Sequence, residues 1–471
     1  MAPGTSPPEP PRLRQTSPLA TYPLLDALLH RRSRRFAPGL QLAAPLEYRS
    51  DAAPQPLTLE EEAALAFAAC GVTGYALAEL PYAPTAPGEP AGGNIMVNFI
   101  GRTVASGHAL HYATVFVIND EGTWMLKRPQ DYPRTEIPGL IQAAREHRLT
   151  ELYQAAQVRV AERRVDVPRE VPYVPPFNRW AANQPGTTYF LPVNEFTEDY
   201  INVLLAAFSE DFGYFLVDDR RRFRPAGIGA FARSRGGHLH DDPRDGLVAT
   251  ITFLETWLYE FAAIEQGGIL QNLALMSQAL GLGGFPHFAA HPFAWFQALD
   301  FRMADLPFST TIGAGSLLRG LLRFSGKEVP VPTAVGLERE GRVLLKPFCP
   351  PYYRNMEEAV RAFINTKYAQ GSGTFRDGGA VTGWKDGGAV QRAIPRYSER
   401  AIAATVAYCE YVYGRYGRFP ATAGPFRTVL AYQANHLDLE FYRRYYRPDV
   451  LTETQRRHEE AWHGDDGGSQ F

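Results

Sequence analysis

Cysteine is scarce in this sequence. The chain of 471 residues contains three cysteines, Cys70, Cys349 and Cys409, which are odd in number and far apart. Such a set does not make a disulfide framework and lacks the closely spaced pairs of a zinc motif. Cysteine usage therefore predicts a protein of a reducing compartment, the cytoplasm.

An excess of one charge is missing too, as is a long uninterrupted apolar run. The chain has 48 basic and 50 acidic residues, for a formal net charge of -2, which argues against nucleic-acid binding driven by net charge. Its longest apolar stretch, EQGGILQNLALMSQALGLGG at residues 265–284, contains amide side chains that a membrane span would tolerate only at a cost. We therefore expect a soluble cytoplasmic protein with no membrane and no nucleic-acid partner.

What is present is enough apolar sequence for a large core. The composition is 45% hydrophobic and 12% aromatic, which is typical of a globular protein. Residues 1–22 are proline-rich, lack the apolar core of a signal peptide and are expected to be a disordered tail. Residues 23–345 are expected to form the main domain, and residues 346–471 an appended helical extension.

Local patterns predict several elements within that frame. The stretch ATVFVIND followed by EGTWMLKR predicts a β-hairpin, and the pattern from TITFLET to LMSQAL predicts one long helix. The segment RDGGAVTGWKDGGAV contains DGGAV twice. It predicts either an ordinary glycine loop or a lid over a site.

Three segments carry the candidate chemistry. The first is RRSRRF at residues 31–36, after a short predicted helix. Its four arginines and serine suit a phosphate, although a basic helix end facing solvent explains them as well. The second is the small-residue loop ASG directly before a buried strand, where backbone can approach a ligand closely beside Ser106 and His108.

The third segment is the apolar stretch at residues 265–284. On a helix, Ile269, Leu273 and Leu280 fall on one core-facing stripe with Met276. Gln271 and Gln278 lie seven residues apart and are expected to share another face. The glycines of GLGG suit the end of a helix. A buried helix whose amides bond to backbone and a helix that contributes to a site both fit this pattern.

Taken in order, the three segments resemble those of the FMN-dependent nitroreductase superfamily. Members typically begin with Arg-Arg-Ser-x-Arg-x-Phe, which RRSRRF resembles. They also have a late helix with Gln-Asn-Leu followed by Ala and Leu-Gly-Leu-Gly, a pattern that QNLALMSQALGLG meets. The segment RTVASGHALHYATVFVINDEGTWML is most similar to the SagB-type dehydrogenase branch, with Ala105 in place of a loop proline. The Lys-Tyr pair that SagB-type azoline oxidases have before this helix occurs here after it, at Lys367-Tyr368, which argues against thiazoline oxidation.

The resemblance implies an α+β, nitroreductase-like fold with a central, mostly antiparallel sheet flanked by helices. It also implies an intertwined homodimer with FMN at the interface, and a small-molecule or peptide substrate. Hydride would pass through flavin N5, either from NAD(P)H to an acceptor or from an organic substrate to the flavin. The cofactor-binding residues that it implies are Arg31, Ser33, Arg35, Ser106, His108, Gln271, Gly283 and Gly284. In this assignment Arg31, Ser33 and Arg35 bind the phosphate and ribityl chain, and the glycine pair lets backbone N–H groups face the flavin.

The histidines offer a catalytic candidate and no recognised metal motif. Clusters occur in GGHLHDD, FPHFAAH and NHLDLEF, yet none has the pattern of a known metal site with its general base, so no metal is expected. His287 follows the flavin-facing glycines and is the candidate proton donor to substrate, with lining of the pocket as the simpler role.

Three functions therefore remain open from the sequence. The first is an FMN-dependent oxidoreductase of the nitroreductase or SagB type. The second is a redox-inactive protein of the same fold that binds partners or assists assembly. The third is a metal-dependent enzyme that uses the histidine clusters.

Overall fold

The structure is a computed structural model of the chain and describes residues 18–82, 95–289 and 291–463. Most of the expected disordered tail, residues 1–17, lies outside the described residues, and Pro18–Thr21 forms the short helix α1. None of the described helices combines the length and the hydropathy needed to cross a membrane.

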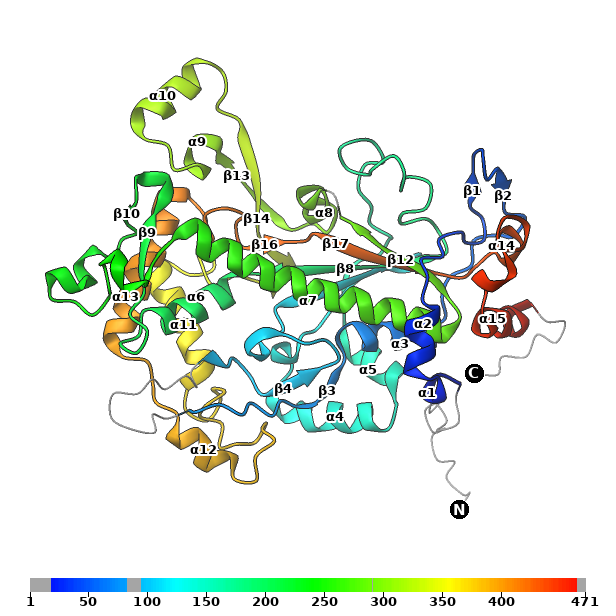
Figure 1. Cartoon of the computed structure of the whole chain (residues 1–471), viewed down its shortest axis with the longest axis horizontal. Coiled ribbons are helices and arrows are strands. Elements are labelled where there is room, and N and C mark those ends of the chain that lie inside the picture. The colour runs from blue at the N-terminus through cyan, green and yellow to red at the C-terminus, as the bar shows by residue number, and fades with distance from the viewer. Residues whose placement is uncertain (1–17, 83–94, 290, 464–471) are drawn as a thin grey trace.

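A seven-stranded sheet forms the centre of the molecule (Figure 1). Its order is β12-β17-β8-β5-β6-β7, with β16 also paired to β8, and all its strand pairs are antiparallel. The strands are β5 (Ala113–Asn119), β6 (Gly122–Leu126), β7 (Gln157–Ala161), β8 (Thr187–Glu195), β12 (Gly283–Phe288), β16 (Phe426–Arg427) and β17 (Leu430–Asn435). The expected α+β architecture with a central antiparallel sheet is confirmed.

The hairpin of β5 and β6 shows how sequence produces this sheet. Every residue of β5 is buried, which fits its run of β-branched and aromatic side chains. Asn119 pairs with Gly122 across a two-residue turn, and the Asn119 Oδ1 accepts hydrogen bonds from the backbone N–H groups of Glu121 and Gly122. The predicted hairpin is confirmed at the predicted turn.

Each face of the sheet has its own apolar core. On one face, alternate side chains of β5 and β8 pack with α3 (Leu59–Cys70), α5 (Leu149–Ala156) and the C-terminal half of α7 (Ile251–Leu280). On the other face they pack with α8 (Pro292–Ala298) and with the hairpin of β13 (Arg302–Pro307) and β14 (Pro330–Arg339). The alternation follows from the two-residue period of a strand.

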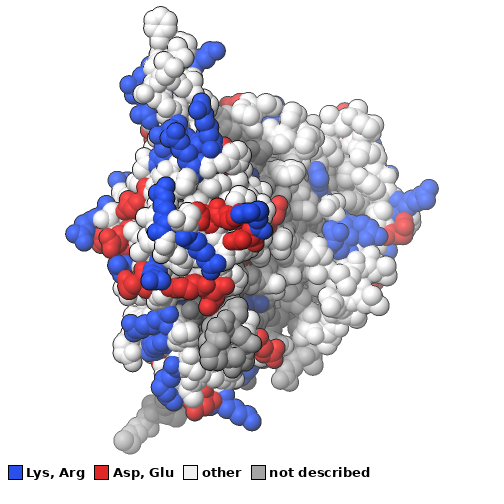
Figure 2. All heavy atoms as spheres, turned by 60° about the vertical axis from the view of Figure 1, so that its left-hand side comes forward, with Lys and Arg blue, Asp and Glu red and all other residues white. Residues whose placement is uncertain are grey.

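A third core lies at one end of the sheet. There α6 (Thr197–Ala207), α11 (Met356–Tyr368) and α13 (Glu399–Tyr416) pack around the N-terminal part of α7. Figure 2 shows this end of the molecule, over which Lys and Arg side chains alternate with Asp and Glu. An arm built from β13, β14, α9 (Phe308–Thr311) and α10 (Ser316–Phe324) projects from it (Figure 1).

The region after residue 346 is largely helical, as expected, and it also completes the central sheet. Besides α11 and α13 it contains α12 (Gly387–Ala393), α14 (Leu439–Tyr445) and α15 (Glu453–His463). Its strand β17 lies between β12 and β8, so this region is part of the main core. The second DGGAV begins helix α12, where the Asp386 side chain accepts a hydrogen bond from the Ala389 N–H.

The remaining elements connect or flank these layers. They are α2 (Leu24–His30), α4 (Ile137–Arg145), β1 (Gln41–Leu42), β2 (Tyr48–Arg49), β3 (Val72–Tyr75), β4 (Ile100–Arg102), β9 (Phe215–Asp218), β10 (Arg224–Pro225), β11 (Val248–Thr250) and β15 (Arg342–Leu345).

Candidate functional site

The arginine segment lies against the glycine-rich end of α7. Helix α2 ends at His30, and the following chain forms a β-bridge in which the Gly284 N–H donates to the Arg34 carbonyl at 2.8 Å. Two residues before β12, Gly281 ends α7 with a φ of 80°. The predicted residues Arg31, Ser33, Arg35, Gly283 and Gly284 are therefore brought together at one place.

The arginines of this segment divide into two groups. Arg34 is 4% exposed and donates to the Val450 carbonyl and to the Gln278 Oε1, so it binds the chain to itself. Arg31 and Arg35 are half-buried, and Ser33 is exposed. The Arg35 guanidinium lies over the Phe285 ring, 4.5 Å from its centroid. These three side chains are accessible to a ligand, whereas Arg34 is structural.

Gly283 and Gly284 allow neighbouring parts of the same chain to pack closely against their backbone. A Cβ at Gly284 would lie 2.3 Å from the Tyr432 hydroxyl, and one at Gly283 would lie 2.7 Å from the Arg34 carbonyl oxygen. Because the Gly284 N–H is already bonded to Arg34, this amide holds the arginine segment in place. It is not directed at solvent or at an open cavity.

His287 follows on the same strand and lines a small cavity. Its ring contacts Phe285 and Tyr189 at centroid distances of 5.1 and 5.2 Å, and the cavity of about 10 Å³ beside it is also lined by Tyr173 and Trp295. Such a volume accommodates about one water-sized group. The predicted location of His287 beside the glycine pair thus coincides with a cavity.

The electrostatics of His287 favour a neutral ring. Burial, helped by the charge of Arg35, lowers its pKa to about 4. The Nδ1 lies 3.2 Å from the Phe288 carbonyl, which fixes the proton on Nδ1, while Nε2 is buried and has no partner among the described residues. At neutral pH the ring therefore presents a hydrogen-bond acceptor, and proton donation to a substrate would first require protonation of this Nε2.

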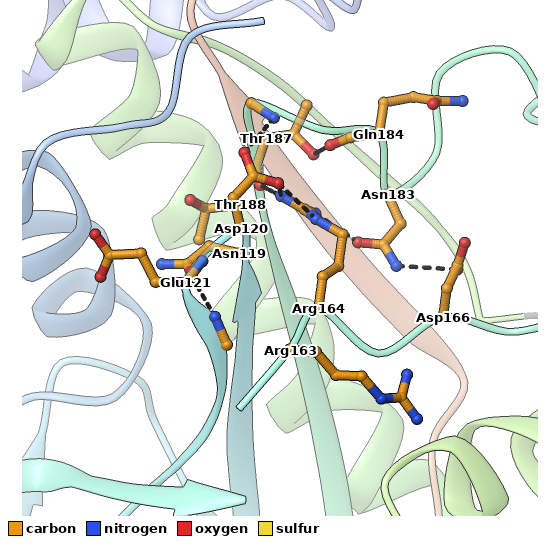
Figure 3. Close-up of polar contacts among 12 residues, drawn as sticks. Asn119, Asp120, Glu121, Arg163, Arg164, Asp166, Asn183, Gln184, Thr187 and Thr188 are labelled. Carbon is orange, nitrogen blue, oxygen red and sulfur yellow. Dashed lines mark hydrogen bonds and ion pairs between the residues drawn. The ribbon is translucent and has the colours of Figure 1, made fainter. Parts of the chain in front are cut away.

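A polar network fixes the wall of this cavity (Figure 3). Arg164 donates to Asp120 Oδ1, to Asn183 Oδ1 and to the Thr187 carbonyl at 2.6–3.0 Å. The Asn183 amide in turn donates to Asp166 Oδ1 at 2.9 Å. Since Asp166 and Asn183 line the cavity, these bonds anchor its wall to the β5–β6 turn.

Ser106 and His108 lie at a second place, on the middle of α7. The Ser106 hydroxyl donates to the buried Glu265 carboxylate at 2.7 Å, and the His108 Nδ1 lies 3.3 Å from Asp199 Oδ1. The φ angles of His108, Ala109 and His111 are 58°, 49° and 51°. Left-handed backbone at three non-glycine residues is unfavourable and is concentrated at functional loops in proteins.

A buried charged cluster adjoins this second place. Burial raises the pKa of Glu195 to about 7 and that of Glu198 to about 8, although Arg128 opposes both shifts. The Arg128 guanidinium lies 3.9 Å from Glu198 and 3.1 Å from Asp131. Sequence analysis did not single out any of these residues, and the signal available was acidic residues next to buried strand β8.

The two glutamines of α7 lie on the same side of the helix, as expected, but differ in environment. Gln271 is exposed, whereas Gln278 is buried and bonded to Arg34, Thr452 and Thr454. The helix presents the same side at both positions, but only its C-terminal end is covered by α15 and the arginine segment. The predicted stripe of Ile269, Leu273, Met276 and Leu280 does pack in the core.

The two groups of candidate residues are well separated within one chain. Glu265 marks the serine loop, and Leu280 marks the end of the helix near the glycines. At 1.5 Å per residue these positions lie about 22 Å apart along the axis of α7. The structure therefore places the two groups of candidate residues at separate positions within one chain.

Comparisons with known proteins find similarity in structure and none in sequence. No family model matches the chain, and no curated protein matches its sequence. The structure aligns with a chain from Ralstonia eutropha described as a "putative nitroreductase", at a TM-score of 0.28 and 14% identity, over 63% of this chain and 80% of that one. At this TM-score and identity we base no functional conclusion on the alignment.

Proposed function

We propose that this protein is an FMN-dependent oxidoreductase of the nitroreductase type that functions as a homodimer. Bound FMN would supply the hydride chemistry at its N5. The substrate would be a small organic molecule or a modified peptide, and NAD(P)H is the proposed electron donor when the substrate is an acceptor.

The observation that carries the proposal is the pair of half-sites on α7. The arginine segment is bonded to Gly284 at the end of the helix, and the Ser106 loop is bonded to Glu265 near its middle. The family that the sequence motifs resemble binds FMN between two subunits. A separation of about 22 Å within one chain suits a site in which one chain supplies the arginines and the other supplies the serine loop.

Exposed apolar side chains support association of two chains. On α7 the outer face carries Phe253 at 64% and Ile264 at 70% exposure, and on α2 the leucines Leu24, Leu25 and Leu29 are 62–73% exposed. Exposed large apolar side chains that gather on a surface are typical of interfaces. Both helices adjoin the half-sites, so a dimer that covers them would bring these half-sites together.

The residues present suit the proposed cofactor in type. Arg31 and Arg35 supply cations and Ser33 a hydroxyl for a phosphate. The buried Nε2 of His287 is an acceptor beside the arginine half-site, and His108 and Ser106 supply polar groups at the other. On this proposal His287 orients a donor group of the ligand and keeps the neighbouring cavity free of a positive charge.

The test measures flavin retention. We expect the purified chain to bind FMN, seen as oxidised-flavin absorbance, and the double substitution Arg31→Ala, Arg35→Ala to lose at least 90% of it. Arg32→Ala is the matched control, because Arg32 is exposed and donates to the nearby carbonyls of Leu29 and Arg31. Flavin content that is equal in all three proteins would refute the assignment of the arginine segment.

A second function, a redox-inactive binding or assembly protein of the same fold, is favoured by a different observation. The Gly284 amide is bonded within the chain, and the cavity at His287 holds about 10 Å³, far less than a flavin ring. A colourless dimer that takes up no added FMN would establish this alternative. A colourless monomer would leave the homodimer proposal without support as well.

A further inference from the structure

Three metal-binding side chains from distant parts of the chain meet at one buried point. Glu61 comes from α3, His436 directly follows β17, and His458 lies on α15. Their ligand atoms all lie within 4.8 Å of one another. The side chains are 10%, 3% and 9% exposed respectively, so the point is nearly shielded from solvent.

The geometry of this cluster suits a single ion. The Nε2 of His436 lies 3.2 Å from one oxygen of Glu61, and the Nε2 of His458 lies 2.7 Å from the other. Ligands held tetrahedrally at 2.0–2.1 Å from zinc are about 3.3 Å from each other. One contact already has about this spacing and the other is about half an ångström shorter, and they end on different oxygens of Glu61. Binding through one carboxylate oxygen therefore requires a small adjustment of these side chains.

The ligand types select a class of metal. Two imidazole nitrogens and one carboxylate suit zinc and neighbouring divalent transition metals, whereas calcium and magnesium prefer oxygen ligands throughout. Three protein ligands leave one coordination position for water. We propose that Glu61, His436 and His458 bind one divalent transition-metal ion, with zinc the best fit to the ligands.

The position of the cluster indicates what the ion would do. Helix α15 covers the end of α7, where a Cβ at Gly281 would lie 2.4 Å from the Thr454 carbonyl. The ion joins this C-terminal helix to α3 and to the end of the central strand β17. The ion would be a structural metal ion that holds the C-terminal segment against the rest of the chain, and its site is separate from the cavity at His287.

Sequence patterns did not reveal this cluster. The expectation of no metal rested on histidines that are close in sequence, such as those of GGHLHDD, whereas these three ligands are 375 and 22 residues apart. His436 was noted there with Asp438 and Glu440. In the structure Asp438 instead caps α14 by accepting a hydrogen bond from the Phe441 N–H.

The experiment uses the full chain, stripped with a chelator, desalted and titrated with Zn²⁺ or Co²⁺. We expect one tightly bound equivalent by elemental analysis, Co²⁺ absorption bands of a four-coordinate site, and a higher Tm with metal than without. His458→Ala and Glu61→Gln are expected to weaken binding at least about 100-fold, more than loss of an outer-shell partner costs. Glu61→Gln keeps an acceptor for the helix cap at Thr58, so it preserves the local fold.

Two further results decide against the proposal. The surface variant His240→Ala is the matched control, because its ring pairs with Asp245 and is not part of the cluster. If it lowers metal content as much as His458→Ala, binding is non-specific and the proposal fails. If the wild-type protein retains no metal ion and Zn²⁺ does not raise its Tm, Glu61, His436 and His458 are held together by hydrogen bonds and do not form a metal site.

Discussion

Replacing Arg34 by methionine tests whether this buried arginine holds the C-terminal segment in place. Arg34 is a buried cation that donates to the Val450 carbonyl at 2.8 and 3.0 Å and to Gln278 Oε1 at 2.9 Å. Methionine keeps much of the side-chain volume but leaves both acceptors without this donor. We therefore expect the variant to be less stable and its C-terminal segment to be loosened.

The magnitude follows from these contacts. A buried acceptor left without its partner costs about 1–3 kcal/mol, so two acceptors cost about 2–6 kcal/mol. Removal of the buried charge offsets part of this cost, which leaves a net destabilisation of about 2–4 kcal/mol. The unfolding entropy of a chain this long is about 1 kcal/mol/K, and the expected fall in Tm is therefore about 2–4 °C.

Two assays and one control make the prediction decisive. Thermal unfolding gives the Tm, and limited trypsin digestion after Arg456 and Arg457, which are exposed on α15, reports release of that helix. Arg32→Met changes the same residue type in the same motif at an exposed position, where we expect a Tm within 1 °C of wild type. If Arg34→Met matches Arg32→Met in both assays, Arg34 does not fasten the C-terminal segment.

Three further predictions concern single residues. Gly284→Ala should destabilise the protein by about 1–3 kcal/mol, because the added Cβ meets the Tyr432 hydroxyl. Gly320→Ala is the control, because a Cβ there meets open space on α10, and it should stabilise the protein by up to about 1 kcal/mol. Urea unfolding of the two variants measures both changes. The pKa of Glu198 is raised to about 8 in the folded state, so its contribution to stability is full below the unfolded pKa near 4.5 and is lost as pH rises through about 8. The fall in Tm between pH 6.5 and 8.5 should therefore be smaller in Glu198→Gln than in the wild type. An equal fall in both proteins would contradict the raised pKa of Glu198. His287→Phe removes a buried nitrogen without a partner among the described residues and also the contact of Nδ1 with the Phe288 carbonyl. These effects oppose each other, so stability should stay within about 1 kcal/mol, and a loss above about 3 kcal/mol would contradict this reasoning.

The fold was predictable from sequence where local pattern decides structure. The β5–β6 hairpin and the 30-residue helix α7 have strong periodicity and recognisable ends, such as the Thr250 cap and Gly281, and both are confirmed. Strand β17 was missed, because LAYQAN is short and its place between β12 and β8 depends on pairing with partners that lie 142–152 and 242–248 positions earlier in the sequence. Such long-range pairing leaves no local signal.

The candidate site divides in the same way. Motif order placed the arginine segment beside the glycine pair and His287, and the structure brings these together. Motif order did not indicate that Arg34, the third arginine of RRSRRF, would be buried, nor that Gln271 and Gln278 would differ in exposure. Both outcomes depend on α15 and the chain around Val450, which lie about 170 residues or more away in sequence and cover only one end of α7.

Helix α7 explains why an apolar segment contains amides, acids and glycines. Its buried polar groups each hold a different part of the chain: Glu265 binds the Ser106 loop, Gln266 binds Asn194 and the start of β17, and Gln278 binds Arg34. Gly268 admits Val104, whose Cγ2 would lie 2.8 Å from a Cβ at that position. The helix thus holds both groups of candidate residues along one axis, so on the proposed function their spacing within one chain would not adjust to a ligand. A second chain that packs along the exposed side of α7 could unite them without any change in this spacing, which is why the oligomeric state and flavin content should vary together.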